Sequence, residues 1–368
     1  MYDKIFPIFA LHFYKTIQNQ RMETRLKIGM PAGSLADPNR GGNLVNLLTN
    51  SGFLVSGYTQ GGPTQFTSVN FLFGWDGRPQ EFGSQLEINE IDVAIAGDDW
   101  IKERVLEMKL EYGTEVYLER VLKLNRGGVK IVGIVEGNEF ETVEDFLTNL
   151  CSQKKLITVV SEMPYIALDW LHTKLDTIGV LDKYQQFSVQ KYKTPSKIES
   201  GIVIYEPWGK TEAKIKNGSA DIGLEITQSG TAIKNYGLTV IDTIMHSQTS
   251  IWINSEIRKD TAKFDLLKMF LLNLYGSINA ENKVMVVFNV SNKNVNAIEH
   301  YLREKNLFAD EPTVIAGKEF TVFNIQIDAA NVNEPMAKVR YELAKCGATS
   351  INTQPVQSSI PSINVILQ

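Results

Sequence analysis

The first third of the chain alternates between short apolar runs and amphipathic stretches. Residues 25–30 are predicted to form a strand and residues 91–97 a short buried strand, and a helix is expected to begin at Asp98. Residues 43–52 carry apolar side chains at helical spacing and end at Gly52. Strands that alternate with helices predict an α/β domain built on a parallel sheet.

The same alternation continues through the middle of the chain. Residues 142–150 form an amphipathic helix in which Thr142 can cap the first turn and Asp145 occupies the third helical position. Residues 238–254 are interpreted as a pair of strands returning to the sheet, and residues 262–276 as an apolar helix. Further strands are predicted at 127–135, 154–162, 201–209 and 220–230.

After the apolar helix the pattern restarts. Strands are predicted at 283–290, 311–317, 319–327 and 349–356, with helices at 294–306 and 334–347. The resulting order, βαββαβ over residues 282–360, is typical of the ferredoxin-like arrangement. A separate small C-terminal domain is therefore expected, although its fold alone does not establish what it binds.

Composition narrows the class of protein. The 368 residues are 43% hydrophobic and 21% charged, which suits a globular protein of two or three domains. A net charge of −5 argues against nucleic acid as a partner, and the absence of a long apolar run argues against a membrane span. Residues 1–21 lack a cleavage site after their short apolar stretch, so we expect a tail, or sequence upstream of the true start, rather than a signal peptide.

The cysteines and histidines do not suggest a metal centre. Cys151 and Cys346 stand far apart, outside any C-x-x-C pair, and the four histidines are scattered. We expect two buried free thiols in a reducing compartment, and no metal-ligating residue of this chain.

The strongest local signal lies in residues 220–231. A buried strand brings Asp221 and Glu225 to a turn rich in Thr, Ser and Gly, and a helix is expected to open near Ala232. Backbone N–H groups at such a turn can cradle a phosphate, while the carboxylates accept hydrogen bonds from sugar hydroxyls. An ordinary strand-to-helix turn would have the same local pattern.

Two other loops are weaker candidates. Residues 31–35 follow the first strand and contain Gly33, which permits close approach of a phosphate to the backbone. Residues 206–212 follow another strand and open a helix; Trp208 in this segment is interpreted as a packing residue.

Six segments, taken in order, resemble one known family. They include RPQEF at residues 78–82, DVAIAGDDWI at 92–101 and ADIGLEITQSGT at 220–231. The full set covers residues 25–35, 78–82, 92–101, 160–165, 208–244 and 347–361. Together they are similar to the long form of the ATP phosphoribosyltransferases of histidine biosynthesis.

The resemblance implies a fold. It predicts a two-lobed, periplasmic-binding-protein-like (type II) α/β catalytic core, with one lobe formed by residues 22–122 and 237–278 and the other by 123–236. Residues 279–368 would form the C-terminal ferredoxin-like βαββαβ domain that binds histidine. A cytoplasmic homo-oligomer, a dimer or a hexamer, is expected.

The resemblance also implies a reaction. N1 of the adenine of ATP would attack C1 of phosphoribosyl pyrophosphate, with Mg²⁺ as cofactor and pyrophosphate as the leaving group. Such a displacement needs no strong protein nucleophile, because Mg²⁺ assists a good leaving group. The lack of a Ser/His/Asp or Cys/His constellation fits this chemistry.

Residue roles follow from the matching positions. The residues expected to face the ribose are Glu212, Asp221 and Glu225. Residues expected to bind substrate are Gly33, Ser34, Arg78, Gly97, Thr227, Gln228, Ser229, Gly230 and Thr231, the last five wrapping the 5-phosphate. Thr313 and Ala316 are expected near the histidine pocket.

Departures from the family pattern keep alternatives open. Ala32 stands where many members have Lys, and Ala96 replaces a Thr. Apparent insertions fall at residues 55–76, 109–120 and 180–198. The alternatives are a catalytically impaired, histidine-responsive paralogue and a two-lobed solute-binding protein.

Overall fold

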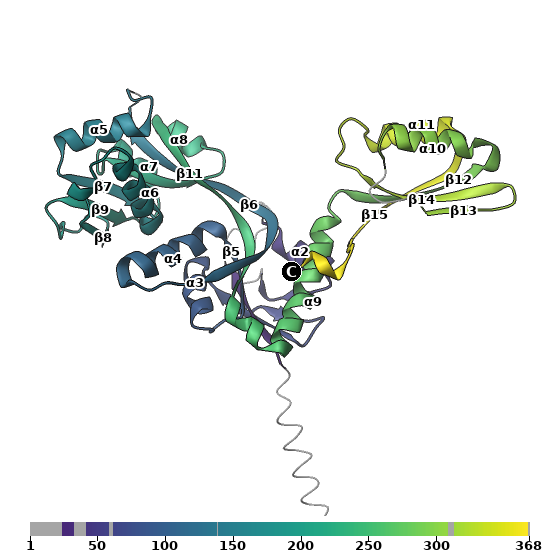
Figure 1. Cartoon of the computed structure of the whole chain (residues 1–368), viewed down its shortest axis with the longest axis horizontal. Helices are drawn as coiled ribbons and strands as arrows, with labels where there is room; N and C mark the ends of the chain where they lie inside the picture. The colour runs from purple at the N-terminus through teal and green to yellow at the C-terminus, as the bar shows by residue number, and fades with distance from the viewer. Residues whose placement is uncertain (1–23, 33–41, 59–61, 138, 308–312, 367–368) are drawn as a thin grey trace, which may run out of the picture. The chain divides into compact units, whose positions relative to one another are not determined.

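A computed structural model describes residues 24–32, 42–58, 62–137, 139–307 and 313–366 of the chain (Figure 1). The expected N-terminal tail, residues 1–21, lies outside these described residues. The chain divides into a larger unit, residues 1–45 and 54–267, and a smaller unit, residues 46–53 and 268–368. The two units are described in turn.

A mixed sheet runs through the larger unit. Its nine described strands lie in the order β4-β1-β5-β11-β6-β10-β7-β9-β8. They are β1 (Leu26–Pro31), β4 (Leu72–Gly77), β5 (Val93–Gly97), β6 (Leu118–Glu136), β7 (Leu156–Ser161), β8 (Phe187–Lys191), β9 (Gly201–Glu206), β10 (Ile222–Thr227) and β11 (Leu238–Asn254). The strands predicted from the sequence at 25–30, 91–97, 154–162, 201–209 and 220–230 are confirmed, and 127–135 forms the end of the longer β6.

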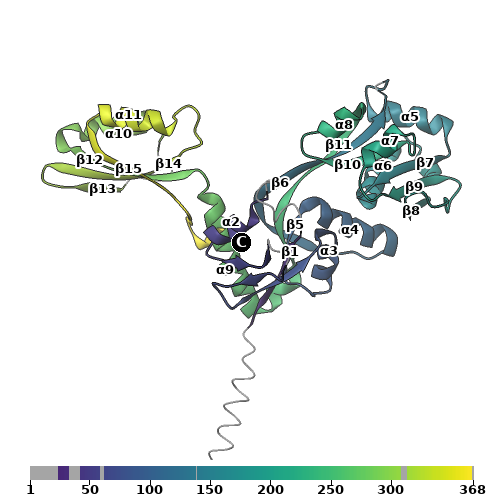
Figure 2. The same ribbon diagram turned by 180° about the vertical axis from the view of Figure 1, so that it is seen from behind.

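Two long antiparallel strands, β6 and β11, connect both halves of this sheet (Figures 1 and 2). One end of β11 pairs with β5, while one end of β6 pairs with β10. The prediction of two strands over residues 238–254 is wrong, because β11 is one strand of 17 residues. Its polar stretch around Ser247 looks like a turn in the sequence. In the structure this stretch stays extended, and the pairing of β11 with β6 shifts in register there.

The sheet therefore has two lobes that share β6 and β11. The first lobe consists of β4, β1 and β5 with the helices α3 (Pro79–Glu87) and α4 (Asp98–Tyr112). The second lobe consists of β10, β7, β9 and β8 with α5 (Val143–Gln153), α6 (Pro164–Thr177), α7 (Thr211–Lys216) and α8 (Thr231–Asn235). A short hairpin of β2 (Val55–Ser56) and β3 (Gln65–Phe66) occupies part of the apparent insertion at 55–76.

Each lobe has its own buried cluster of apolar side chains. In the second lobe, Leu147, Ile166 and Leu171 of the helices pack against Ile157 and Ile204 of the sheet. The smaller cluster of the first lobe consists of Phe82, Leu86, Ile91, Ala94, Ala96 and Ile101. Apolar area removed from water stabilises each lobe by about 25 cal/mol per Å².

Helix α5 begins as the sequence predicts. The Thr142 side chain accepts a hydrogen bond from the Asp145 backbone N–H at 3.1 Å, and its own hydroxyl donates to the Asp145 carboxylate at 2.6 Å. This cap satisfies one of the N–H groups that a helix leaves without an internal partner. The predicted helix start at residue 142 is confirmed.

The smaller unit has the predicted βαββαβ element order. Its elements are β12 (Lys283–Ser291), α10 (Val295–Glu304), β13 (Thr313–Ala316), β14 (Phe320–Asp328), α11 (Met336–Lys345) and β15 (Ala348–Pro355). The described strands form an antiparallel sheet in the order β13-β14-β12-β15. Two helices, α2 (Leu44–Asn50) and α9 (Thr261–Asn279), extend from the larger unit into this one; within it, Ser51 donates to Ser277 at 2.9 Å.

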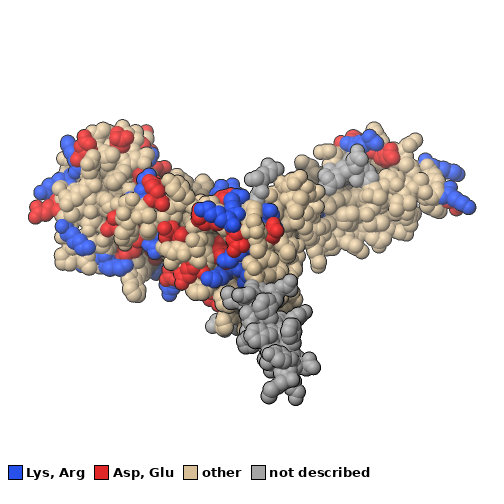
Figure 3. Space-filling model, turned by 60° about the horizontal axis from the view of Figure 1, so that its bottom comes forward, with Lys and Arg blue, Asp and Glu red and all other residues tan. Residues whose placement is uncertain are grey.

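The two faces of the small sheet differ. Helices α10 and α11 cover one face, where Phe288 and Phe323 stack with ring centroids 5.2 Å apart. The strand register places uncharged side chains on the opposite face, among them Met285, Val287, Val322, Asn324 and Gln326. Figure 3 shows the smaller unit, at right, with a broad uncharged surface and with charged side chains near its edges.

Two further observations bear on the expectations from composition. Cys151 and Cys346 are free thiols, each half-buried rather than fully buried. Among the described residues, no helix has both the length and the apolar character needed to cross a membrane.

Candidate active site

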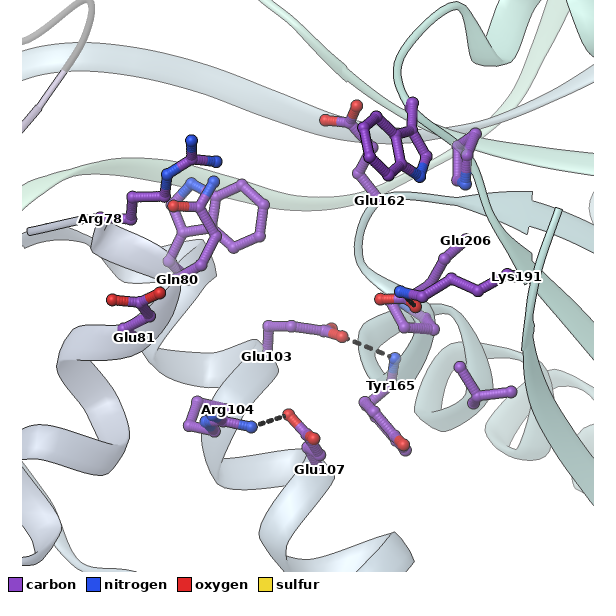
Figure 4. A pocket seen from close by; sticks show the side chains of 15 residues that line it. Arg78, Gln80, Glu81, Glu103, Arg104, Glu107, Glu162, Tyr165, Lys191 and Glu206 are labelled. Carbon is purple, nitrogen blue, oxygen red and sulfur yellow. Dashed lines mark hydrogen bonds and ion pairs between the residues drawn. The ribbon is translucent and has the colours of Figure 1, made fainter.

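The carboxyl ends of the strands in each lobe open onto one cavity. In each lobe the parallel strands end at the same edge of the sheet, which is where α/β proteins bind ligands. The cavity has a volume of about 730 Å³ and is seen from close by in Figure 4. It is lined by Arg78, Gln80, Glu81, Trp100, Glu103, Arg104 and Glu107 from the first lobe, and by Glu162, Pro164, Tyr165, Val189, Lys191, Glu206, Pro207 and Trp208 from the second.

The cations of the cavity differ in their availability. Arg104 is paired with Glu107 on the next turn of α4, and Lys191 is paired with Glu206 on the neighbouring strand. The predicted site residue Arg78 lies directly before α3, and its guanidinium has no partner among the described residues (Figure 4). Among the described residues that line this cavity, Arg78 is therefore the cation that is available to a phosphate.

Two indole side chains reach the cavity from different lobes. Trp100 on α4 is half-buried against the core, whereas Trp208, after β9, is 93% exposed. The interpretation of Trp208 as a packing residue is wrong, because almost none of its surface contacts the protein. Its segment follows the carboxyl end of β9, so the indole extends into the opening instead of the core.

A group of carboxylates lies at the end of β10. Burial, together with the negative charges of Glu212 and Glu162, raises the pKa of Glu225 to about 7, although a hydrogen bond with Thr211 opposes the shift. Glu212 is itself buried in the first turn of α7. The structure therefore brings together two predicted residues, Glu212 and Glu225, and adds Glu162.

The turn at residues 227–231 follows directly. The Gly230 backbone N–H donates to the Thr227 hydroxyl at 2.9 Å, and the Thr231 N–H donates to the Ser229 hydroxyl at 3.3 Å. Gly230 has φ of +72°, a conformation that favours glycine. Gln228 is exposed, and α8 begins at Thr231, close to the predicted start at Ala232. The turn is thus held by its own hydroxyls in a shape that leaves its backbone near the surface.

Asp221 lies at the other end of the strand. Its carboxylate accepts hydrogen bonds from the Thr158 N–H at 2.9 Å and the Thr158 hydroxyl at 2.8 Å, and it pairs with Lys154. The six residues of β10 separate Asp221 from the turn by about 20 Å at roughly 3.3 Å per residue. The structure therefore does not bring Asp221 to the turn; its carboxylate joins β10 to β7.

The local packing explains why glycine occupies position 97. A Cβ atom at this position would lie 2.1 Å from the Asp99 carboxylate, which turns back to accept from the Trp100 N–H. The Asp99 N–H in turn donates to Ser247 on β11 at 3.0 Å. Glycine at 97 therefore allows the first turn of α4 to form against β11.

Of the predicted residues that the structure describes, Arg78 is among those that line the cavity, whereas Glu212, Glu225 and the 227–231 turn are not. Gly33 and Ser34 lie outside the described residues. Thr313 and Ala316 lie on β13, the edge strand of the small sheet, and both are exposed.

Several cavity residues were not predicted. Glu162 stands in the VSEMPY segment at the carboxyl end of β7, so its position after a buried strand was a usable signal. Glu103 and Arg104 gave no such signal, because they lie within α4 and reach the cavity only through the packing of α4 against α6. Lys191 lies in an apparent insertion that the family pattern does not cover.

These features define a two-lobed α/β protein with a polar cleft at the carboxyl ends of its parallel strands. The family model for ATP phosphoribosyltransferase matches residues 78–275. The chain belongs to this family, and it is a transferase of the first step of histidine biosynthesis.

Individual relatives extend the match over most of the chain. ATP phosphoribosyltransferase of Nitratidesulfovibrio vulgaris is 25% identical, over 84% of this chain and 90% of the relative. That of Chlorobium phaeovibrioides is 24% identical, over 89% and 94%. Among solved structures, a chain of the ATP phosphoribosyl transferase complex from Thermotoga maritima gives a TM-score of 0.45 at 14% identity, over 68% of this chain and 98% of that chain.

Proposed function

We propose that the 227–231 turn binds the 5-phosphate of phosphoribosyl pyrophosphate and that ATP binds across the cavity from it. The observation that carries this proposal is the group formed by Glu225, Glu212 and Glu162 directly beside the turn. A sugar phosphate needs both features side by side, N–H and hydroxyl donors for the phosphate and carboxylate acceptors for the ribose hydroxyls.

The turn is suited to exchange its own hydrogen bonds for those of a phosphate. The N–H groups of Gly230 and Thr231 donate to hydroxyls of the same turn, so a phosphate oxygen can replace either acceptor. The hydroxyls of Thr227, Ser229 and Thr231 are then free to donate to the same anion. Glu225 lies two residues before the turn, a spacing that suits the ribose attached to that phosphate.

ATP has a different set of partners. Arg78 supplies a positive charge for its phosphates, and the exposed indole of Trp208 offers a flat apolar surface for adenine. Trp100 extends this surface from the first lobe. Gly33 and Ser34 keep the role that the family resemblance implies, beside the nucleotide or pyrophosphate.

Mg²⁺ fits the residues at the end of β10. No group of three or more potential ligand side chains in the described part of the chain has the geometry of a metal site. Mg²⁺ in phosphate-handling sites commonly uses one or two carboxylates and takes its other ligands from the substrate and water. Glu225 and Glu212 would supply those carboxylates, and the ion would neutralise charge on the departing pyrophosphate.

The chemistry then follows from positioning. The bond between adenine N1 and ribose C1 forms as the bond between C1 and the pyrophosphate oxygen breaks, so no protein nucleophile takes part. The 227–231 turn fixes the ribose phosphate, and the ionised Glu225 stabilises the positive charge that develops on the sugar. Arg78 and Trp208 hold the adenine in line with C1.

The smaller unit is proposed as the regulatory part of the molecule. We infer a ferredoxin-like histidine-binding domain from its βαββαβ order, with Thr313 and Ala316 near the bound amino acid. Histidine would inhibit by favouring one arrangement of the enzyme over another. A homo-oligomer is proposed as well, with a periplasmic-binding-protein-like (type II) core in each subunit.

Turnover by the purified full chain tests this function. With Mg²⁺, ATP and phosphoribosyl pyrophosphate, we expect pyrophosphate release matched one to one by an adenine-N1 adduct, measured by a coupled phosphatase assay and mass spectrometry. Glu225→Gln should lower kcat/KM for phosphoribosyl pyrophosphate roughly 10- to 100-fold. Glu136→Gln, an exposed carboxylate paired with Lys216, serves as the matched control. Binding of both substrates without any adduct would instead identify an impaired paralogue.

A further inference from the structure

Helix α6 begins without a cap of its own. Its N-cap residue, Met163, has no side chain that can accept a hydrogen bond, and Pro164 occupies the first turn. The backbone N–H groups of the next residues therefore need an acceptor from elsewhere. They belong to Tyr165 and Ile166, which are both buried.

Glu103 supplies that acceptor from the other lobe. One oxygen of its carboxylate accepts from the Tyr165 N–H at 2.9 Å (Figure 4). The other oxygen accepts from the Ile166 N–H at 2.8 Å. Glu103 lies on α4 in the first lobe and is only 7% exposed. A carboxylate at a helix N-terminus is favourable because the exposed N–H groups and the helix dipole both attract negative charge.

Other contacts between α4 and α6 are weaker. Lys102 and Asp169 are 3.7 Å apart with side chains 42% and 43% exposed, so solvent screens their attraction. The Tyr165 hydroxyl donates to Glu111 at 3.3 Å. Glu103 is thus the buried polar link between the two helices, in addition to the long strands β6 and β11 that the lobes share.

The contact of Glu103 with α6 lies close to residues that line the cleft. Glu162 immediately precedes the Met163 cap of α6 and belongs to the carboxylate group beside Glu225. Arg78 and Trp100 reach the same cavity from the lobe that carries Glu103. Burial, together with the nearby Glu107 and Glu206, raises the pKa of Glu103 to about 8. The two N–H donors oppose this shift, and they are in place only when α6 is docked on α4.

We propose that Glu103 is a positioning residue that closes the substrate cleft by capping α6 of the opposite lobe. It acts through α6. By fixing the position of this helix, it holds Glu162 and the end of β7 opposite Arg78 and Trp100 across the cavity. This inference rests on the proposed function, because it takes the cleft between the lobes as the place where both substrates meet.

Kinetics of three variants test the inference. Glu103→Ala should raise KM for both substrates roughly 10- to 100-fold, while kcat at saturation falls less than about 3-fold, since bound substrates can themselves draw the lobes together. Glu103→Gln keeps one acceptor oxygen and should lie between Ala and wild type. The control, Glu111→Gln on the same helix, should stay within about 2-fold of wild type, because Glu111 accepts only the longer bond from the Tyr165 hydroxyl.

Hydrogen exchange gives a readout that does not depend on turnover. The amides of Tyr165 and Ile166 should be protected in the wild-type protein, although first-turn amides of helices usually exchange fast, and Glu103→Ala should lose that protection locally. Unprotected amides in the wild-type protein, or unchanged KM values in both Glu103 variants, would overturn the proposal. If the wild-type protein were inactive but these amides were protected, the proposed function would be refuted, while the contact by which Glu103 joins the two lobes would be supported.

Discussion

At the scale of single residues, Glu225 links the geometry of the cleft to pH. Burial and the nearby Glu212 and Glu162 raise its pKa to about 7, so the carboxyl is mostly protonated below that pH. Only the ionised form can accept from both ribose hydroxyls and attract Mg²⁺. We therefore expect kcat/KM for phosphoribosyl pyrophosphate to rise with pH through about 7 and then level off.

Stability should respond to the same group in the opposite sense. Since folding raises the pKa of Glu225, its favourable contribution is complete below the unfolded value and is lost as pH rises through about 7. Glu225→Gln should therefore flatten the pH profile of kcat/KM while raising the unfolding temperature at pH 8. A profile that keeps its shape in this variant would assign the ionisation to another group.

Trp208 is predicted to act as a stacking surface for adenine. Trp208→Ala should raise KM for ATP roughly 5- to 100-fold, the range measured for loss of one base-stacking aromatic, and Trp208→Phe should retain most of the affinity. KM for phosphoribosyl pyrophosphate should change little. Quenching of tryptophan fluorescence by ATP should decrease in Trp208→Phe, which leaves only the contribution of Trp100 in the cavity; quenching of wild-type size in that variant would exclude stacking on Trp208.

The position of a residue is predictable from the sequence where it follows from the place of that residue along a strand or turn. Glu225 precedes a Gly-containing turn by two residues, and the structure places it there. Asp221 carries the same chemistry four residues earlier, but a strand places it at the opposite edge of the sheet, where it meets Thr158. Glu103 could not be found, because its role depends on contact with the first turn of another helix, where Tyr165 follows it by 62 residues in the chain.

At the scale of elements, the cap of α5 gives a prediction that is independent of catalysis. Thr142→Ala removes the acceptor for the Asp145 N–H and should lower the free energy of unfolding by about 1 kcal/mol, measured by urea denaturation. Thr142→Ser should keep most of that stability. Equal stability of the Ala variant and the wild-type protein would show that the cap contributes nothing, and kcat should be unchanged in both variants.

The elements themselves were largely predictable, because apolar runs and caps are local features. The exception, β11, shows the limit of that reasoning. Its residues 238–254 contain a polar stretch around Ser247 that locally resembles a turn, yet pairing with β6 along its length keeps it extended. The length of a strand that two lobes share is set by its partners, which the local sequence does not reveal.

At the scale of the whole molecule, the histidine response is the property that involves the smaller unit. We expect histidine to lower turnover without being displaced by phosphoribosyl pyrophosphate, as determined by inhibition patterns. Thr313→Val removes a hydroxyl on β13 and should weaken this inhibition while leaving turnover without histidine intact. Simple competition with phosphoribosyl pyrophosphate would place the histidine site in the cleft.

The central claim is that the 227–231 turn is the phosphate site, and calorimetric titration with phosphoribosyl pyrophosphate tests it most directly. Gly230 and Gly218 both have positive φ and open space around them, so valine strains the backbone similarly at either position. Only Gly230 lies in the turn. The account predicts that Gly230→Val abolishes binding while the folded Gly218→Val variant binds like the wild-type protein; wild-type affinity in a folded Gly230→Val variant would contradict it.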